Sequence, residues 1–504
     1  MRLKLFPQRP DHPLADSKEL KRILAEILVD RPVNAIEELT GWYQSLKHAE
    51  NFRLDNYLDV IRQLDDAAQP HLLRLERDYL YFPQLSALEE QRLWTESYNY
   101  WGEVAALYGL CVQRANLDPK SKGTDRFKES LPLVMARVQA ALGTQVRWLA
   151  YRYAPVGEDL WSKLGETYMA AEAASQAQKS VQLYPSRRGL TSVAQQYFHT
   201  LVFFTSSMDS LLPRQIDLAD RLVAHFSPGF VFSRDHRPAS VYWVDAAGGL
   251  APTRLARRPG MSRPGLRFFS PGTALTALTE LIHLVERGEV PPDLNFGGEY
   301  PPRVLLPVLQ HLRVYWALRP PQRRYQRHPV KTRMVVVHGF DSSHAVFAGA
   351  AGNLTEEAGV QHWLVQNVSL GGFRACVDDS RGHQVTLGSL FSMQPEGGDN
   401  WLLGVARRYN RLARGHAVVG VQVLSRQARS VELQPRRSGF STAVPGIHLR
   451  DGGEPDLVRI VLPQGSFNVR ESLDFNLDGR HCVLIPVELE ESGGDYEIAR
   501  FREQ

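Results

Sequence analysis

The stretch QNVSLGGFRA, residues 366–375, places an amide and a hydroxyl two positions apart, just before a pair of glycines. Side chains two positions apart on an extended segment face the same side, so Asn367 and Ser369 would point together. Gly371 and Gly372 lack a Cβ, which permits a tight turn and a close approach of the backbone to another molecule. The stretch predicts a strand, a turn and a second strand, and it poses a choice between a catalytic serine and a ligand cradle.

Further apolar runs on both sides of this turn predict an antiparallel β-barrel. They alternate or run apolar, as barrel strands do. The runs after the turn are LGSLFSMQ (387–394), NWLLGVARRYN (400–410) and HAVVGVQVLS (416–425). Before it, MVVVHGFD (334–341) reads as a strand that ends in a turn at His338 and Gly339, which resembles the turn before the oxyanion hole of many serine hydrolases. A longer segment, residues 339–362, interrupts them and is expected either to form a lid or to displace the pocket.

A cluster of arginines precedes the first of these runs. QRRYQRHPV, residues 322–330, holds three guanidiniums within five positions, directly after a proline pair that ends a helical pattern. An R-x-x-x-R spacing followed by N-x-S-x-x-G resembles the signature of the PilZ domain, and here it is carried by Arg323, Arg327, Asn367, Ser369 and Gly372. The resemblance covers about residues 322–430.

This resemblance implies that the chain binds cyclic di-GMP, a bacterial second messenger with two phosphodiesters and two guanines. The chemistry of the residues agrees with it. A guanidinium donates paired hydrogen bonds to phosphate oxygens or to the O6/N7 edge of guanine, and its flat face stacks on a purine. The amide and the hydroxyl offer further hydrogen bonds. The expected ligand-binding residues are Arg323, Arg324, Arg327, Asn367, Ser369, Gly371 and Gly372.

The region before the arginines is predicted to be helical. From Ser17, which can cap a helix, to about Leu212, apolar residues recur at spacings of three and four. WSKLGETY, residues 161–168, followed by Ala177, resembles the first helix of a single tetratricopeptide repeat. Between residues 226 and 269 the alternation changes, and a small β-hairpin insertion is expected there.

The end of the chain again reads as strands, in runs such as LVRIVLP (457–463) and HCVLIPVELE (481–490). The predicted fold class is therefore multidomain α+β, with a long all-α amino-terminal region followed by antiparallel β-structure. The expected domains are a helical region at 1–320, a PilZ-like β-barrel at 322–433 and a carboxy-terminal β-region at 434–504.

The composition limits the function classes. The chain is 43% hydrophobic and 23% charged with a formal net charge of +4, so no global field indicates a nucleic-acid partner. Cys111, Cys376 and Cys482 lie far apart, which fits neither a zinc site nor a disulfide framework. No run reaches ~18 apolar residues and the start lacks signal-peptide features. We expect a cytoplasmic protein without a transmembrane segment, a metal or a cofactor.

The favoured function is a bacterial cyclic di-GMP effector whose helical region transmits the signal by binding another, unknown protein. The alternative is a PilZ-like assembly scaffold that binds no nucleotide. A serine hydrolase comes third, because a nucleophile elbow needs G-x-S-x-G between a strand and a helix. Position 367 is Asn and the residues after Ser369 read as a strand, so no catalytic residue is predicted.

Overall fold

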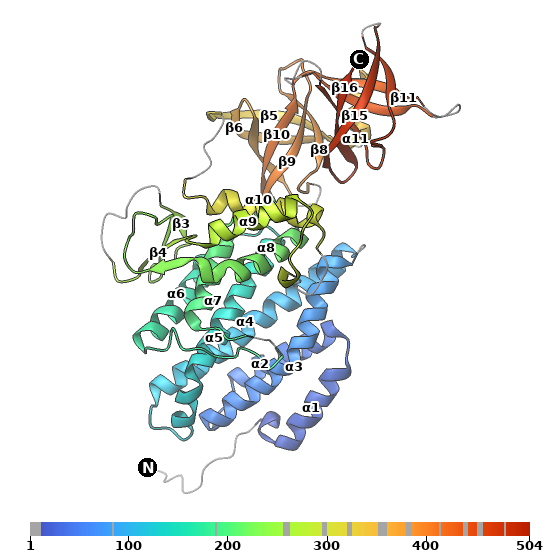
Figure 1. Ribbon diagram of the computed structural model, residues 1–504. Helices are drawn as coiled ribbons and strands as arrows, with labels where there is room; N and C mark the ends of the chain where they lie inside the picture. Colours follow the sequence, from blue (N-terminus) through green and yellow to red (C-terminus); the bar gives the residue numbers. More distant parts are fainter. Residues whose placement is uncertain are drawn as a thin grey trace. The chain divides into compact units, whose positions relative to one another are not determined.

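The computed structural model divides the chain into two compact units, one largely helical and one built of β-barrels (Figure 1). The helical unit runs to Pro321 but leaves out residues 153–155, which group with the barrel unit. The structure describes residues 12–504 except 83–84, 187–188, 256–262, 295–299, 320–324, 351–359, 380–384, 413–414, 437–441, 451–456 and 478–479.

Long helices make up most of the helical unit, as the sequence predicts. Asp16 caps the first of them, with its side chain accepting from the Lys18 amide at 2.7 Å, so Ser17 is the first helical residue rather than the cap. None of the described helices combines the length and apolar character needed to cross a bilayer. The helices are α1 (Ser17–Val29), α2 (Pro32–Lys47), α3 (Leu54–Tyr81), α4 (Ala87–Leu117), α5 (Thr124–Tyr151), α6 (Glu158–Ala173), α7 (Val193–Thr205), α8 (Pro213–Phe226), α9 (Ala274–Glu286) and α10 (Pro302–Trp316).

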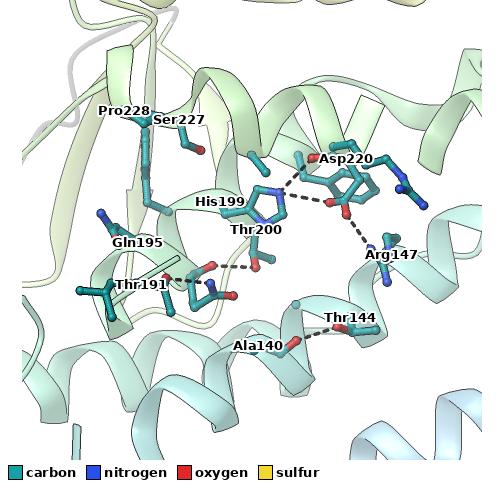
Figure 2. A pocket seen from close by; sticks show the side chains of 17 residues that line it. Ala140, Thr144, Arg147, Thr191, Gln195, His199, Thr200, Asp220, Ser227 and Pro228 are labelled. Carbon is teal, nitrogen blue, oxygen red and sulfur yellow. Dashed lines mark hydrogen bonds and ion pairs between the residues drawn. The ribbon is translucent and has the colours of Figure 1, made fainter. Parts of the chain in front are cut away.

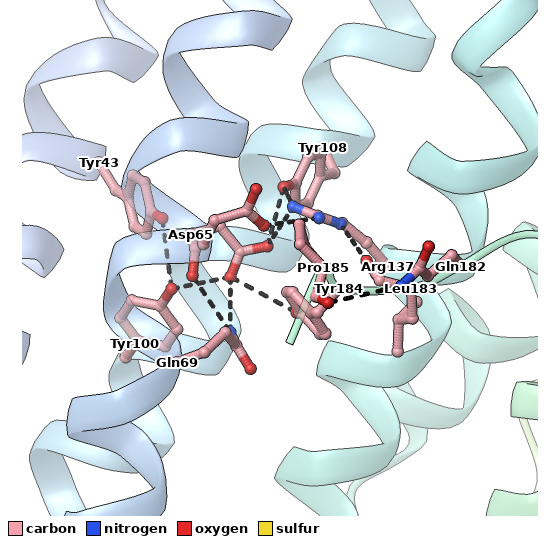
Figure 3. Close-up of polar contacts among 11 residues, drawn as sticks. Tyr43, Asp65, Gln69, Tyr100, Tyr108, Arg137, Gln182, Leu183, Tyr184 and Pro185 are labelled. Atoms are coloured by element: carbon pink, nitrogen blue, oxygen red, sulfur yellow. Dashed lines mark hydrogen bonds and ion pairs between the residues drawn. The ribbon is translucent and has the colours of Figure 1, made fainter. Parts of the chain in front are cut away.

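A buried polar network fixes several of these helices together (Figure 3). Asp65 on α3 is fully buried and accepts from Tyr100 at 3.0 Å and from Tyr108 at 2.8 Å, both on α4. Arg137 on α5 donates to Asp65 at 3.0 Å and lies against the ring of Tyr184. A buried charge is tolerated only when it is paired and hydrogen-bonded, so this network makes the packing of α3, α4 and α5 specific.

A four-stranded antiparallel sheet lies in the chain between α8 and α9, where the sequence indicated only a hairpin. Its strands are too short to show clear alternation, and the longest is buried along its whole length. The turn after the second strand packs on α6, since a Cβ at Gly165 would lie 1.8 Å from the Ala246 carbonyl oxygen. This contact explains why position 165 of α6, the helix that resembles part of a tetratricopeptide repeat, is a glycine. The next α-helix begins only at Val193. The strands, in the order β1-β4-β2-β3, are β1 (Val231–Ser233), β2 (Tyr242–Asp245), β3 (Thr253–Arg254) and β4 (Leu266–Ser270).

The barrel unit contains two closed antiparallel barrels. In the described residues, the first has the strand order β10-β7-β6-β5-β8-β9 and the second β11-β12-β13-β16-β15-β14. The second barrel begins with β11, so the sequence boundary at 433/434 falls inside a strand. The strands are β5 (His328–His338), β6 (Gln361–Ser369), β7 (Gly372–Asp378), β8 (Leu390–Pro395), β9 (Leu402–Arg411), β10 (His416–Ser425), β11 (Ala428–Pro435), β12 (Val444–Leu449), β13 (Leu457–Pro463), β14 (Leu473–Leu477), β15 (Arg480–Ser492) and β16 (Tyr496–Glu503).

The two barrels share an apolar core in addition to the core inside each of them. Helix α11 (Phe340–Phe347), the described part of the long segment after β5, contributes Phe340 to this shared core. Two contacts lead from this helix to Asp495 and Ser430 of the second barrel. The Phe340 amide donates to Asp495 Oδ2 at 2.7 Å, and His344 Nε2 lies 2.6 Å from Ser430 Oγ. The described residues of this segment therefore join the barrels, whereas the expectation of a lid or of a displaced pocket also falls on residues 351–359, which lie outside the described residues.

Candidate ligand-binding site

A depression of about 260 Å³ lies on the first barrel, where the β6–β7 turn meets β9 and β10. Four of the sequence-predicted residues, Arg327, Ser369, Gly371 and Gly372, lie on its surface although they come from two distant stretches. The residues that line the depression are Tyr325, Arg327, Ser369, Gly371, Gly372, Phe373, Arg407, Arg408, Gly420, Val421 and Gln422.

A β-bulge in β6 determines which way the turn residues face. Val365 pairs with Ala375, and Asn367 pairs with Arg374, so Gln366 is the extra residue. Trp363 and Val365 belong to the core of the barrel. Without the bulge, Asn367 and Ser369 would follow these residues into the core; one extra residue reverses the alternation and turns both to the outer face.

The turn itself is fixed by backbone contacts. The Ser369 hydroxyl donates to the Gly372 carbonyl at 3.0 Å, which leaves its lone pairs to accept from a ligand. A Cβ at Gly372 would lie 2.0 Å from the Val421 carbonyl oxygen, so β10 approaches this position too closely for a side chain. At Gly371 a Cβ would instead meet the ring of Tyr325 at 3.0 Å. The two glycines thus allow a strand and an aromatic ring to lie against the turn.

A second bulge places two neighbouring arginines at the same depression. Arg408 pairs with Gly420 and Ala406 pairs with Val421, so Arg407 has no partner on β10. Neighbours on a regular strand face opposite sides, whereas a bulge re-aims a side chain. Gly420 has no side chain, and a Cβ at this position would lie 3.2 Å from the Cβ of Arg408. The depression is therefore lined here by a position without a side chain, Gly420, and by two neighbouring arginines.

Arg407 is held in a defined position by two acceptors. Its Nε donates to Gln422 Oε1 at 2.8 Å, and its two Nη groups donate to the two carboxylate oxygens of Glu491 at 2.6 Å each. Burial alone would raise the pKa of Glu491, but the guanidinium outweighs it and lowers that pKa. Both partners are therefore charged at neutral pH, and a carboxylate of the second barrel reaches the edge of the depression.

Three predicted residues are not seen in the depression. Arg323 and Arg324 lie outside the described residues. Asn367 is not among the residues that line it, although its Oδ1 is buried and has no hydrogen-bond partner in the described part of the chain. A buried carbonyl oxygen without a donor typically costs about 1–3 kcal/mol.

The residues that the sequence reasoning missed are Tyr325, Phe373 on β7 and the groups contributed by β9 and β10. Tyr325 lies within the arginine-rich stretch 322–330 and could have been named from the sequence. Arg407 and Arg408 were visible only as a pair of charges in an otherwise apolar run. Their place beside the turn depends on strand pairing and on the bulge, which a local pattern does not report.

Ser369 lacks the surroundings of a nucleophile elbow. It ends a strand and is followed by a turn and another strand, not by a helix. His338, the histidine that suggested an oxyanion turn, has its ring against Trp363 and Phe391, and burial lowers its pKa. Within the described residues, no three His, Cys, Asp or Glu side chains come together to hold a metal ion.

The helical unit has a cavity of its own, about 420 Å³, between α5, α7 and α8 (Figure 2). Asp220 accepts from Arg147 at 2.6 Å and lies 3.2 Å from His199 Nε2, while Arg147 also contacts Glu76 at 2.9 Å. Burial alone would lower the pKa of His199, but Asp220 outweighs it and raises that pKa. Since Arg147 already lies between two carboxylates, this cavity is poorly suited to a phosphate.

Comparison with known proteins relates the helical unit to a receptor family. Residues 18–237 match the family model described as cyclic-di-GMP receptor FimW, N-terminal domain. The match lies within the helical unit, from α1 to the start of the inserted sheet. No curated protein matches the chain. The helical unit is thus similar to the amino-terminal domain of a cyclic di-GMP receptor, and this finding is independent of the barrel motifs.

Proposed function

We propose that this protein is a cytoplasmic, PilZ-like receptor that binds cyclic di-GMP on its first barrel. The observation that carries the proposal is that Arg327 and the turn Ser369–Gly372 line the same depression. The family match in the helical unit supports the same ligand from a different part of the chain.

The chemistry of the depression suits a cyclic dinucleotide. Arg327 and Arg408 provide forked donors for phosphodiester oxygens or for the Hoogsteen edge of guanine. The ring of Tyr325, 38% exposed, provides a surface on which a purine can stack. Gly371, Gly372 and Gly420 line the depression without adding side chains to it. Together these groups address both the charged and the aromatic parts of the ligand.

The size of the depression indicates how the ligand would lie. Pockets that enclose a drug-sized ligand usually measure roughly 300–1,000 Å³. At about 260 Å³ the depression would hold one nucleotide half of the ligand. Arg323 and Arg324, which directly precede Tyr325 in the chain, would contact the other half.

Calorimetric titration of the full chain with cyclic di-GMP tests the proposal. We expect saturable binding with a Kd in the micromolar range or tighter, because a few charge-assisted hydrogen bonds of about 1.5–3 kcal/mol each supply about −8 kcal/mol. Arg327→Ala should weaken binding tenfold or more, and excess GMP or ATP should compete poorly. No saturable binding at tens of micromolar ligand would favour the alternative, a scaffold that binds no nucleotide.

The proposal includes an output through the helical unit. A receptor without a catalytic site must pass its signal on by contact, so the helical unit would bind another protein. Ligand should then change the affinity for that protein by about 5–150-fold, the usual range of coupling between two sites. A partner that binds equally well with and without ligand would remove this part of the proposal and leave ligand binding intact.

A further inference from the structure

The pairing of Arg407 suggests that the second barrel regulates the site on the first. Arg407 lines the depression, but its guanidinium makes a two-pronged ion pair with Glu491 on β15 of the second barrel. Tyr496 donates to the same carboxylate at 3.0 Å and fixes its position. A negative charge of the second barrel thus occupies the donors that an anionic ligand in the depression would use.

The surroundings of Arg407 favour exchange of one anion for another. The side chain is 37% exposed and that of Glu491 25% exposed, so both are reached by solvent at the edge of the depression. Gln422 holds Nε at 2.8 Å and lines the depression too, which keeps the guanidinium in place when its other acceptor changes. A phosphodiester presents two oxygens to a guanidinium in the same forked geometry as a carboxylate.

We propose that Arg407 is a ligand-binding residue that exchanges the Glu491 carboxylate for a phosphodiester oxygen pair of the bound ligand. The Glu491 carboxylate then competes with the ligand for Arg407, and ligand binding breaks one contact between the barrels. This inference rests on the proposed function, since it concerns an anionic ligand in the same depression. By linkage, a change that removes the Glu491 carboxylate and leaves Arg407 in place must strengthen ligand binding, and bound ligand must weaken the contact between Arg407 and Glu491.

The chain provides a closely matched control. Glu490, the next residue on β15, makes the same two-pronged contact with Arg459 on β13, with distances of 2.8 and 3.0 Å. Neither residue lines the depression. Glu490→Gln removes a neighbouring charge and a comparable ion pair, and it leaves Arg407 paired.

The test is titration of the full-length wild type, Glu491→Gln, Glu490→Gln, Arg407→Gln and the double variant Arg407→Gln/Glu491→Gln with cyclic di-GMP. We expect Glu491→Gln to bind at least about fivefold more tightly than wild type, the lower limit of typical coupling. Glu490→Gln should bind as wild type does. Glu491→Gln should bring no gain when Arg407 is already Gln, because its effect acts through that side chain.

A second measurement follows the released contact directly. Hydrogen exchange of the wild type should show that saturating cyclic di-GMP lowers the protection of the β15 amides around Glu491, while β13 stays unchanged. Equal affinities of the wild type and Glu491→Gln, or equal gains in both glutamate variants, would overturn the exchange and leave the receptor proposal standing. Absence of saturable binding in every variant would instead overturn the receptor proposal itself.

Discussion

At the scale of single residues, Gly372 is needed for the packing of the barrel itself, whether or not a ligand is bound. Its φ is 157°, and a Cβ would lie 2.0 Å from the backbone oxygen of Val421. We expect Gly372→Ala to destabilise the ligand-free protein by about 1–3 kcal/mol, the usual cost of a strained backbone position. Urea unfolding without ligand measures this.

Gly371→Ala is the control for this prediction. Its Cβ would meet only the Tyr325 ring, at 3.0 Å, which can shift. We expect stability close to wild type and a weaker affinity for cyclic di-GMP, because the stacking surface moves. If Gly372→Ala unfolds at the wild-type urea concentration, the close approach of β10 does not constrain this position.

His448 makes the stability of the second barrel dependent on pH. The side chain is buried, and neither ring nitrogen has a hydrogen-bond partner among the described residues. Burial lowers its pKa from the ordinary 6.5; Glu503 opposes this, while Arg450 and Arg429 reinforce it. The unfolded chain therefore takes up a proton at a higher pH than the folded one. The stabilising contribution is complete above pH 6.5 and is lost as the pH falls below it.

His448→Leu should reduce this dependence. We expect unfolding free energies measured between pH 7.5 and about pH 5 to fall less steeply in the variant, because one group no longer changes its protonation on unfolding. Burial also lowers the pKa of His338, so part of the pH dependence of the unfolding free energy should remain in the variant. Identical slopes in both proteins would show that His448 takes up no extra proton on unfolding.

At the scale of elements, the pair of Asp65 and Arg137 decides whether α3, α4 and α5 pack uniquely. Arg137 is 1% exposed and also donates to the Leu183 carbonyl at 2.9 Å. Arg137→Met leaves a buried carboxylate without its counter-charge, which typically costs 3–5 kcal/mol. We expect the helical transition, followed by circular dichroism in urea, to shift by about this amount. Arg22→Met, on the exposed face of α1, should leave the transition in place.

The elements also show what the sequence can predict. The strands around residues 366–375 and the helices before Leu212 were predicted because their signal is local, an alternation or a spacing within one segment. The bulges at Gln366 and Arg407 were not, because a bulge exists only relative to the strand beside it. Four of the eleven residues that line the depression could therefore be named from the sequence, and Arg408 was not among them.

At the scale of the whole molecule, the two units are joined by the chain at more than one place. Residues 153–155, between α5 and α6, group with the barrel unit, and the chain crosses again after Pro321. The Tyr153 carbonyl accepts from the Arg411 amide at 2.9 Å, and its ring meets Tyr409 edge-on at 5.6 Å. A link between α5 and α6 thus completes the packing of the first barrel, and a fragment that begins after Pro321 lacks it.

Tyr153→Ala should consequently destabilise the first barrel although the residue is flanked by helices of the other unit. Its φ of 54° is unusual for a residue with a side chain, which indicates that its contacts hold the backbone in place. The ring packs against the barrel core, and truncation of a partly buried aromatic side chain costs roughly 1–3 kcal/mol. Hydrogen exchange of the full chain should show lower protection in β9 and β10 and unchanged protection in α3 and α4. Unchanged protection in β9 and β10 would mean that the barrel packs without this link, and the barrel fragment should then be as stable as the barrel in the full chain.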